Sequence, residues 1–148
     1  MRKNDFLVYV IEDSEDERVI FDEASMIAKD QLKNPKKSIE FKYFSDYAEF
    51  KHELEDNGNN FKKLPSIIIT DLFIGQSTGF DVLKFIKESE LKFIPVIVLS
   101  STANDEDLRK AYDMRSNSFL VKPADFNEFV DQIRSLLDFW IKTKIRTY

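Results

Sequence analysis

The sequence contains no cysteine among its 148 residues. This absence excludes disulfide bonds and thiolate metal sites, and it suits a reducing compartment. On this ground we expect a cytoplasmic protein.

Long apolar runs are also missing. One apolar run, residues 6–11, stops at Glu12 and Asp13, and the other long run covers only residues 93–99. A membrane-spanning helix needs roughly 20 apolar residues. We therefore expect neither a signal peptide nor a membrane span.

Basic residues are outnumbered by acidic ones, 22 against 27, which gives a net charge of -5. Proteins that bind nucleic acid usually carry a broad basic surface. We therefore expect no nucleic-acid partner.

The residues that are present describe an ordinary globular domain. The chain is 43% hydrophobic and 33% charged, and it has fourteen phenylalanines, five tyrosines and one tryptophan for packing. Its length suits one domain with a well-formed core.

Five short runs rich in β-branched and aromatic residues predict strands. The first, third and fourth runs are continuously apolar, as buried parallel strands require, whereas the second alternates as an edge strand does. The runs are residues 6–11, 39–44, 67–69, 96–99 and 118–121.

Segments with helical spacing separate and follow these strands. Ser14, with Glu17 three residues later, has the pattern of a capping box. The alternation of strands and helices predicts an α/β fold with a parallel sheet. The five predicted helices begin near Ser14, Asp46, Thr78, Asp105 and Asp125.

Polar residues follow four of the apolar runs directly. Ligands of parallel α/β sheets bind beyond the carboxyl ends of the strands, so these residues are the candidates for one site. They are Glu12 and Asp13, Asp71, Ser100, and Lys122.

Carboxylates that converge at one sheet edge repel each other and need a compensating positive charge. Mg²⁺ prefers carboxylate oxygens, and Lys122 can add an ammonium group. With the Ser100 hydroxyl, these groups can hold a phosphoryl group on Asp71, which would act as the nucleophile. Each residue alone has an ordinary explanation, such as a helix cap or a surface lysine. Four strand ends that all carry what one site needs favour the functional interpretation.

The residues resemble the receiver domain of response regulators over nearly the whole chain, residues 4–142. The matching segments are residues 10–14, 69–72, 95–100 and 119–123, together with Gly79. The resemblance implies a doubly wound, flavodoxin-like sheet of five parallel strands in the order 2-1-3-4-5, with five helices.

By position, the resemblance makes Asp71 the phosphoacceptor and pairs Lys122 with the phosphoryl group. It also implies a Mg²⁺ site formed by Glu12, Asp13, Asp71 and the backbone carbonyl of Phe73.

Ser100 and Phe119 stand at the hydroxyl and aromatic switch positions of the family. Pro123 matches a position at which a cis peptide bond is common. Phe73 departs from the small polar residue that is frequent there, and we hypothesise that it shields the acyl phosphate from water.

The connection at residues 56–65 and the ending at residues 137–140 resemble the stand-alone regulators that serve bacterial phytochrome-type histidine kinases. Without an output domain, such a regulator signals to a downstream protein, which the sequence does not name. In that subgroup the face of the fourth helix, fifth strand and fifth helix can form homodimers. Tyr112, Phe119, Phe139 and Trp140 could contribute to it, although core packing explains the last two equally well.

The expected function is therefore a response regulator that is phosphorylated by a histidine kinase, with Mg²⁺-dependent self-phosphorylation and slow self-dephosphorylation as its only activities.

A flavodoxin-like cofactor site is disfavoured, because residues 13–17 are mostly acidic and would repel a phosphate. A haloacid dehalogenase-type phosphohydrolase would need an aspartate at Phe73. The alternative that stays open is a pseudo-receiver, which binds proteins without being phosphorylated. His52, in a polar helical stretch, is interpreted as a surface residue.

Overall fold

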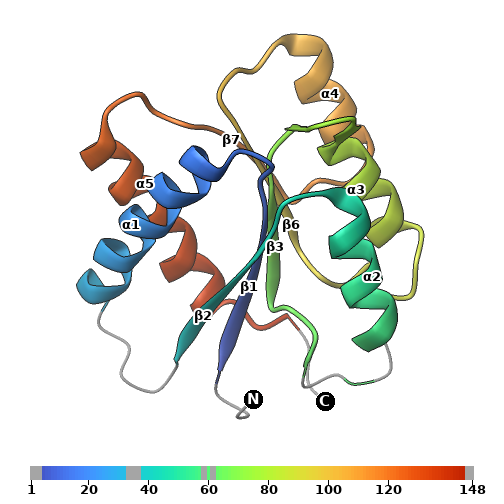
Figure 1. Ribbon diagram of the computed structural model, residues 1–148, viewed down its shortest axis with the longest axis horizontal. Helices are drawn as coiled ribbons and strands as arrows, with labels where there is room; N and C mark the ends of the chain where they lie inside the picture. The colour runs from blue at the N-terminus through green and yellow to red at the C-terminus, as the bar shows by residue number, and fades with distance from the viewer. Residues whose placement is uncertain (1–4, 33–37, 58–59, 61–62, 146–148) are drawn as a thin grey trace.

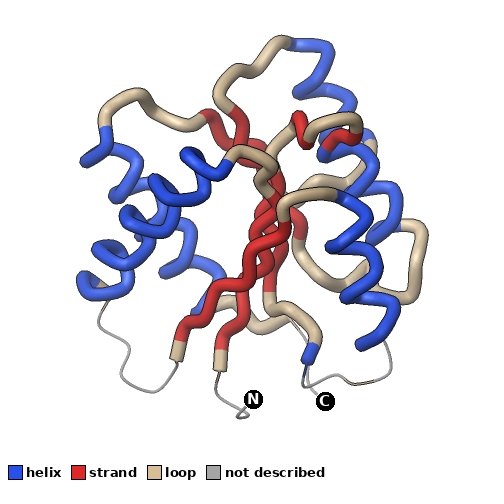
Figure 2. The backbone as a smooth tube through the Cα atoms, viewed as in Figure 1, coloured by secondary structure: helices blue, strands red, loops and turns tan. Residues whose placement is uncertain are grey.

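The fold is a central parallel sheet between two layers of helices, as seen in a computed structural model that describes residues 5–32, 38–57, 60 and 63–145. Figure 2 shows the strands in one layer with helices on both sides. The main sheet has the strand order β2-β1-β3-β6-β7. The predicted α/β class, strand order and five helices are confirmed.

The strands of this sheet lie within one residue of the predicted runs. They are β1 (Phe6–Ile11), β2 (Ile39–Phe44), β3 (Ile67–Thr70), β6 (Val96–Ser100) and β7 (Ser118–Val121). Every residue of β1, β3 and β6 is buried, whereas β2 mixes buried and exposed residues, as expected for an edge strand.

Two hydrophobic clusters hold the helices on the sheet. The helices α1 (Glu15–Gln31) and α5 (Phe126–Lys142) cover one face, and α2 (Tyr47–Asn57), α3 (Gly79–Lys87) and α4 (Asp105–Asp113) cover the other (Figure 1). Phe21 of α1 and Ile133 of α5 belong to the first cluster, and Phe50 of α2 and Leu83 of α3 belong to the second. Because both sheet faces are buried, the strand ends are held in fixed positions.

The helix starts agree with the sequence, with one exception. Asp46 accepts a hydrogen bond from the Glu49 amide, and Asp125 caps α5. Ser14 also caps α1, because its hydroxyl accepts from the Glu17 amide at 3.3 Å. The predicted reciprocal bond of a capping box is replaced, since the Ser14 amide donates to Glu12 Oε1 at 3.0 Å.

A short hairpin, not predicted from the sequence, follows β3. It consists of β4 (Phe73–Ile74) and β5 (Ser77–Thr78), paired antiparallel. Gly75 lies between the two strands with φ +60°, a conformation that residues with a Cβ rarely adopt. The hairpin directs the chain from Asp71 back into α3.

Within the described part of the chain, none of the helices combines the length and the apolar character that a bilayer crossing requires.

Gly79 lets the start of α3 pack against the Asp71 backbone. Its amide donates to the Leu72 carbonyl at 2.7 Å, and a Cβ at this position would lie 2.7 Å from the Asp71 carbonyl oxygen. Such a contact is much closer than packed atoms allow, and the obstacle is backbone, which cannot move aside cheaply.

We predict that Gly79→Ala lowers the free energy of unfolding by about 2 kcal/mol, because the α3 start must move away from Asp71. Urea denaturation monitored by Trp140 fluorescence measures the change. Ser135→Ala, at an exposed position of α5, is the control and should change it by less than about 0.5 kcal/mol. An equal effect of both substitutions would show that the close approach is not important for stability.

Candidate functional site

The carboxyl ends of the parallel strands bring the predicted site residues to one edge of the sheet. Glu12 and Asp13 follow β1, Asp71 follows β3, Ser100 ends β6 and Lys122 follows β7. The register keeps these ends level, since Ile11 pairs with Thr70 and Ser100 pairs with Val121. The Asp71 amide also donates to the Ile11 carbonyl at 3.1 Å.

The Lys122 ammonium is the centre of this group. Its Nζ lies 3.4 Å from Glu12 Oε2, 3.5 Å from Asp71 Oδ2 and 3.6 Å from Glu17 Oε2. Burial lowers the pKa of Lys122, but Asp71, Glu12 and Glu17 outweigh this effect and raise it above its ordinary value. Lys122 is therefore a firmly protonated cation.

Glu12 is the most deeply buried acid of the site, with only 5% of its surface exposed. Burial, followed by the hydrogen bond and the charge of Asp71, raises its pKa to about 8, against the opposing effects of the Ser14 amide and Lys122. Burial is thus the main reason that Glu12 holds its proton more tightly than an ordinary glutamate, and Asp71 adds to it.

The two aspartates are oriented by backbone amides. Asp71 Oδ1 accepts from the Leu72 amide at 2.6 Å, and Asp13 Oδ2 accepts from the Gly75 amide at 2.9 Å. These bonds leave Asp71 Oδ2 facing Lys122. Asp13 is exposed, at the solvent side of the same edge.

The predicted switch residues are buried at the neighbouring strands. Ser100 is 1% exposed, and its hydroxyl accepts a hydrogen bond from the Thr102 amide at 3.4 Å. Phe119 is 9% exposed, and its amide donates to the Tyr112 hydroxyl at 3.2 Å. A cis peptide bond was expected at Pro123, but all peptide bonds among the described residues are trans.

The donor set fits a hard divalent cation in chemistry. Glu12, Asp13 and Asp71 offer carboxylate oxygens, which Mg²⁺ and Mn²⁺ prefer. Burial, and after it the neighbouring Asp71, raises the pKa of Glu12, so a cation beside it would favour the charged carboxylate. In the described part of the chain, no three acidic or histidine side chains already converge as a metal site. Instead, the Lys122 ammonium lies between Glu12 and Asp71.

Glu17 is the site residue that sequence reasoning assigned to another role. The serine three residues before it suggested a capping box, whereas its carboxylate contacts Lys122. The sign that Glu17 is not needed for the cap is structural: the Ser14 amide donates to Glu12 instead.

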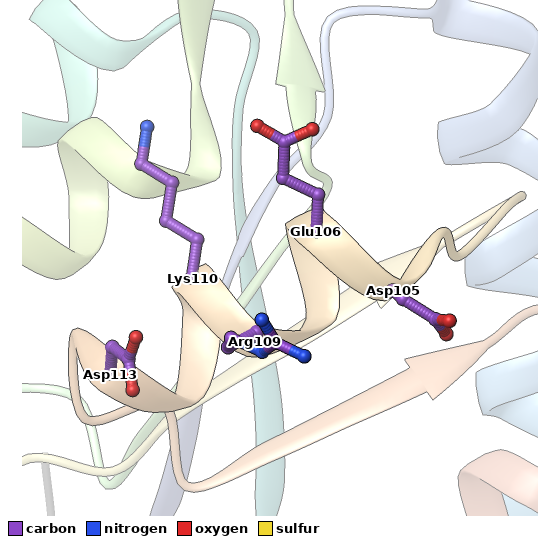
Figure 3. A pocket seen from close by; sticks show the side chains of 5 residues that line it. All are labelled: Asp105, Glu106, Arg109, Lys110 and Asp113. Carbon is purple, nitrogen blue, oxygen red and sulfur yellow. The ribbon is translucent and has the colours of Figure 1, made fainter.

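A hollow of about 360 Å³ lies on α4. Figure 3 shows its five side chains, all from this helix: Asp105, Glu106, Arg109, Lys110 and Asp113. Lys110 Nζ also lies 4.3 Å from the centre of the Phe80 ring. This open surface of mixed charge contains no group of the strand-end site.

Comparison with known proteins agrees with this geometry. The family model described as the response regulator receiver domain matches residues 8–134. The chain is 37% identical over 81 residues to the probable methanogenesis regulatory protein FilR2 of Methanothrix harundinacea, covering 54% of this chain and 52% of that protein. It is 31% identical over 80 residues to response regulator Rcp1 of Synechocystis, covering 53% and 54%. The chain thus spans about half the length of these curated relatives.

Among solved structures, the fold is similar to the phosphorylated cyanobacterial phytochrome response regulator RcpA. The TM-score is 0.79 at 25% identity, over 94% of this chain and 96% of that one.

Glu12 makes the stability of the metal-free protein depend on pH. Its pKa is about 8 in the fold and 4.5 in the unfolded chain, so the fold holds a proton that the unfolded chain has released. This contribution is present in full below pH 4.5 and is lost as the pH rises to 8. We therefore predict that Glu12→Gln becomes progressively more stable, relative to wild type, as the pH rises through this range.

Urea denaturation in chelator-containing buffer at several pH values measures the difference. Exposed Glu15→Gln is the control for the loss of one glutamate charge. A pH-independent difference between Glu12→Gln and wild type would contradict the raised pKa.

Proposed function

The chain belongs to the response regulator receiver family of two-component signalling, whose model matches residues 8–134, and on this premise we propose that a histidine kinase phosphorylates it on Asp71. The proposed receiver domain covers residues 4–142, of which residues 4, 33–37, 58–59 and 61–62 lie outside the described residues. The family is not one of catalytic enzymes, so the proposed chemistry is acceptance and slow loss of one phosphoryl group.

One observation carries this proposal: Asp71 Oδ2 lies 3.5 Å from a protonated Lys122, at the end of a buried strand. The Asp71 side chain is 16% exposed, so its carboxylate is accessible but mostly enclosed. The Leu72 amide fixes the other oxygen. A nucleophile held in this way meets the positioning requirement of phosphoryl transfer.

In the proposed reaction, Asp71 Oδ2 forms a bond to phosphorus while the bond from phosphorus to the kinase histidine breaks. The leaving imidazole takes the electron pair of that bond. Lys122 neutralises charge on the phosphoryl oxygens. Glu12, Asp13, Asp71 and the backbone carbonyl of Phe73 are the proposed ligands of Mg²⁺, which supplies charge neutralisation when bound.

The proposed switch uses Ser100 and Phe119. The Ser100 hydroxyl would exchange its hydrogen bond with the Thr102 amide for one to the phosphoryl group. Movement of the β6 end reaches Phe119 through the pairing of Val98 with Phe119. The face of α4, β7 and α5 would then change its surface.

Two features support the proposed partners. The structurally similar RcpA is a phytochrome response regulator, which favours a phytochrome-type histidine kinase here. On the α4, β7 and α5 face, Tyr112 is 50% and Phe139 is 61% exposed, so both are available for a homodimer or a downstream protein. Trp140, by contrast, packs partly against the cluster beneath α1 and α5.

Replacement of the phosphoacceptor tests the proposal directly. We predict that wild-type protein incubated with acetyl phosphate and Mg²⁺ gains the mass of one phosphoryl group, and that Asp71→Asn gains none, because an amide is not a nucleophile at this pH. Intact-protein mass spectrometry measures both. Asp113→Asn, at an exposed position of α4, is the control and should be labelled like wild type.

Absence of labelling in the wild type, with acetyl phosphate and with a phosphorylated histidine kinase, would instead favour the pseudo-receiver.

Phe73 gives a second prediction, on the lifetime of the phosphorylated form. Phe73 is 57% exposed and lies two residues after Asp71. We predict that Phe73→Ala shortens the phosphoryl half-life several-fold, because water reaches the acyl phosphate more easily. Loss of phosphate after donor removal measures the rate, with Phe139→Ala as the exposed aromatic control. A wild-type lifetime of only seconds, or equal half-lives, would contradict the shielding.

A further inference from the structure

We propose that Glu17 is a positioning residue for Lys122: its carboxylate holds the Lys122 ammonium on the solvent side of the site when Mg²⁺ binds to Glu12 and Asp71. This inference rests on the proposed function and adds to it a residue outside the predicted site.

The contact itself joins the first turn of α1 to the end of β7. Lys122 Nζ lies 3.6 Å from Glu17 Oε2, nearly as close as it lies to Glu12 and Asp71. The three acids differ in exposure: the side chains of Glu12 and Asp71 are 7% and 16% exposed, whereas that of Glu17 is 45% exposed. Glu17 is therefore the outermost of the three partners.

Local structure explains why the Glu17 carboxylate is available. In a capping box it would accept from the Ser14 amide, but Glu12 Oε1 already accepts that hydrogen bond at 3.0 Å. The Ser14 hydroxyl still caps the Glu17 amide. The helix start is thus satisfied without the Glu17 carboxylate, which is left to pair with Lys122.

Charge repulsion gives this contact a function. The ammonium lies against the same two carboxylates, Glu12 and Asp71, that are proposed to bind a divalent cation. Two positive groups cannot share these oxygens closely, so Lys122 must withdraw as the cation enters. Glu17 offers the withdrawn ammonium a partner that is already in contact with it. Without this carboxylate, cation binding would leave Lys122 poorly compensated.

The test is the Mg²⁺ dissociation constant of the whole protein, measured by isothermal titration calorimetry at fixed pH and ionic strength. Glu17→Gln keeps the shape of the side chain and removes its charge. Glu15→Gln removes one charge from the same helix turn at an exposed position. We expect E17Q to bind Mg²⁺ about three-fold more weakly than E15Q does.

The same substitution in a Lys122→Met background separates positioning from a general loss of charge. If Glu17 acts through Lys122, adding E17Q to K122M changes the dissociation constant by less than about 1.5-fold. Urea midpoints close to wild type confirm that the variants are folded.

Equal affinities of E17Q and E15Q would overturn the inference, as would an E17Q effect that is undiminished in the K122M background. In both cases wild-type Mg²⁺ binding would leave the proposed function standing. Absence of Mg²⁺ binding by the wild type would overturn the proposed metal site itself.

Discussion

Excess negative charge at one edge of the sheet is the constraint on which the rest of the structure depends. The ammonium of Lys122 has three acidic neighbours, Glu12, Asp71 and Glu17. Asp13 directly follows Glu12 in the sequence and lies at the same edge. Two like charges about 4 Å apart cost roughly 4 kcal/mol at the effective dielectric of a protein surface. One lysine cannot offset the repulsion among all of these carboxylates. This crowding adds to the effect of burial, which is the larger cause, in raising the pKa of Glu12.

The scaffold can hold these charges together because its apolar layers are independent of them. Every residue of β1, β3 and β6 is buried between the two hydrophobic clusters, so the strand ends cannot spread apart to relieve the repulsion. Gly79 and the Gly75 turn contribute locally, since they let the chain double back next to Asp71. Stability comes from the core, and the edge is left free to be electrostatically strained. That division is common at functional sites.

Most of the fold, and the sheet edge at which the candidate site residues lie, could be predicted from the sequence because both depend on strong local signals. Buried parallel strands are continuous apolar runs, and each site residue is the polar residue that ends one of them. The hairpin after β3 escaped prediction, since its strands have two residues each and its geometry depends on the positive φ of Gly75. The contact of Glu17 with Lys122 was not predicted for a different reason: the spacing of Glu17 from Ser14 is fully explained by a local capping box. Only the tertiary position of Glu12 shows that this explanation is half right.

The topology itself compensates part of the negative charge. In a parallel α/β sheet the helices begin at the carboxyl ends of the strands, so the N-termini of α1, α3, α4 and α5 lie at the edge that carries the acids (Figure 1). Helix N-termini carry partial positive charge, which favours nearby anions. In α1, however, Glu15, Asp16 and Glu17 occupy the first turn and already use this field. A phosphoryl group on Asp71 would replace the single charge of the carboxylate with up to about two negative charges on the phosphoryl oxygens. The groups that must respond to it are those with exchangeable partners, Lys122 and the Ser100 hydroxyl. In the proposed function, charge compensation would therefore be the physical basis for coupling the site to the surfaces of β6, β7 and α1.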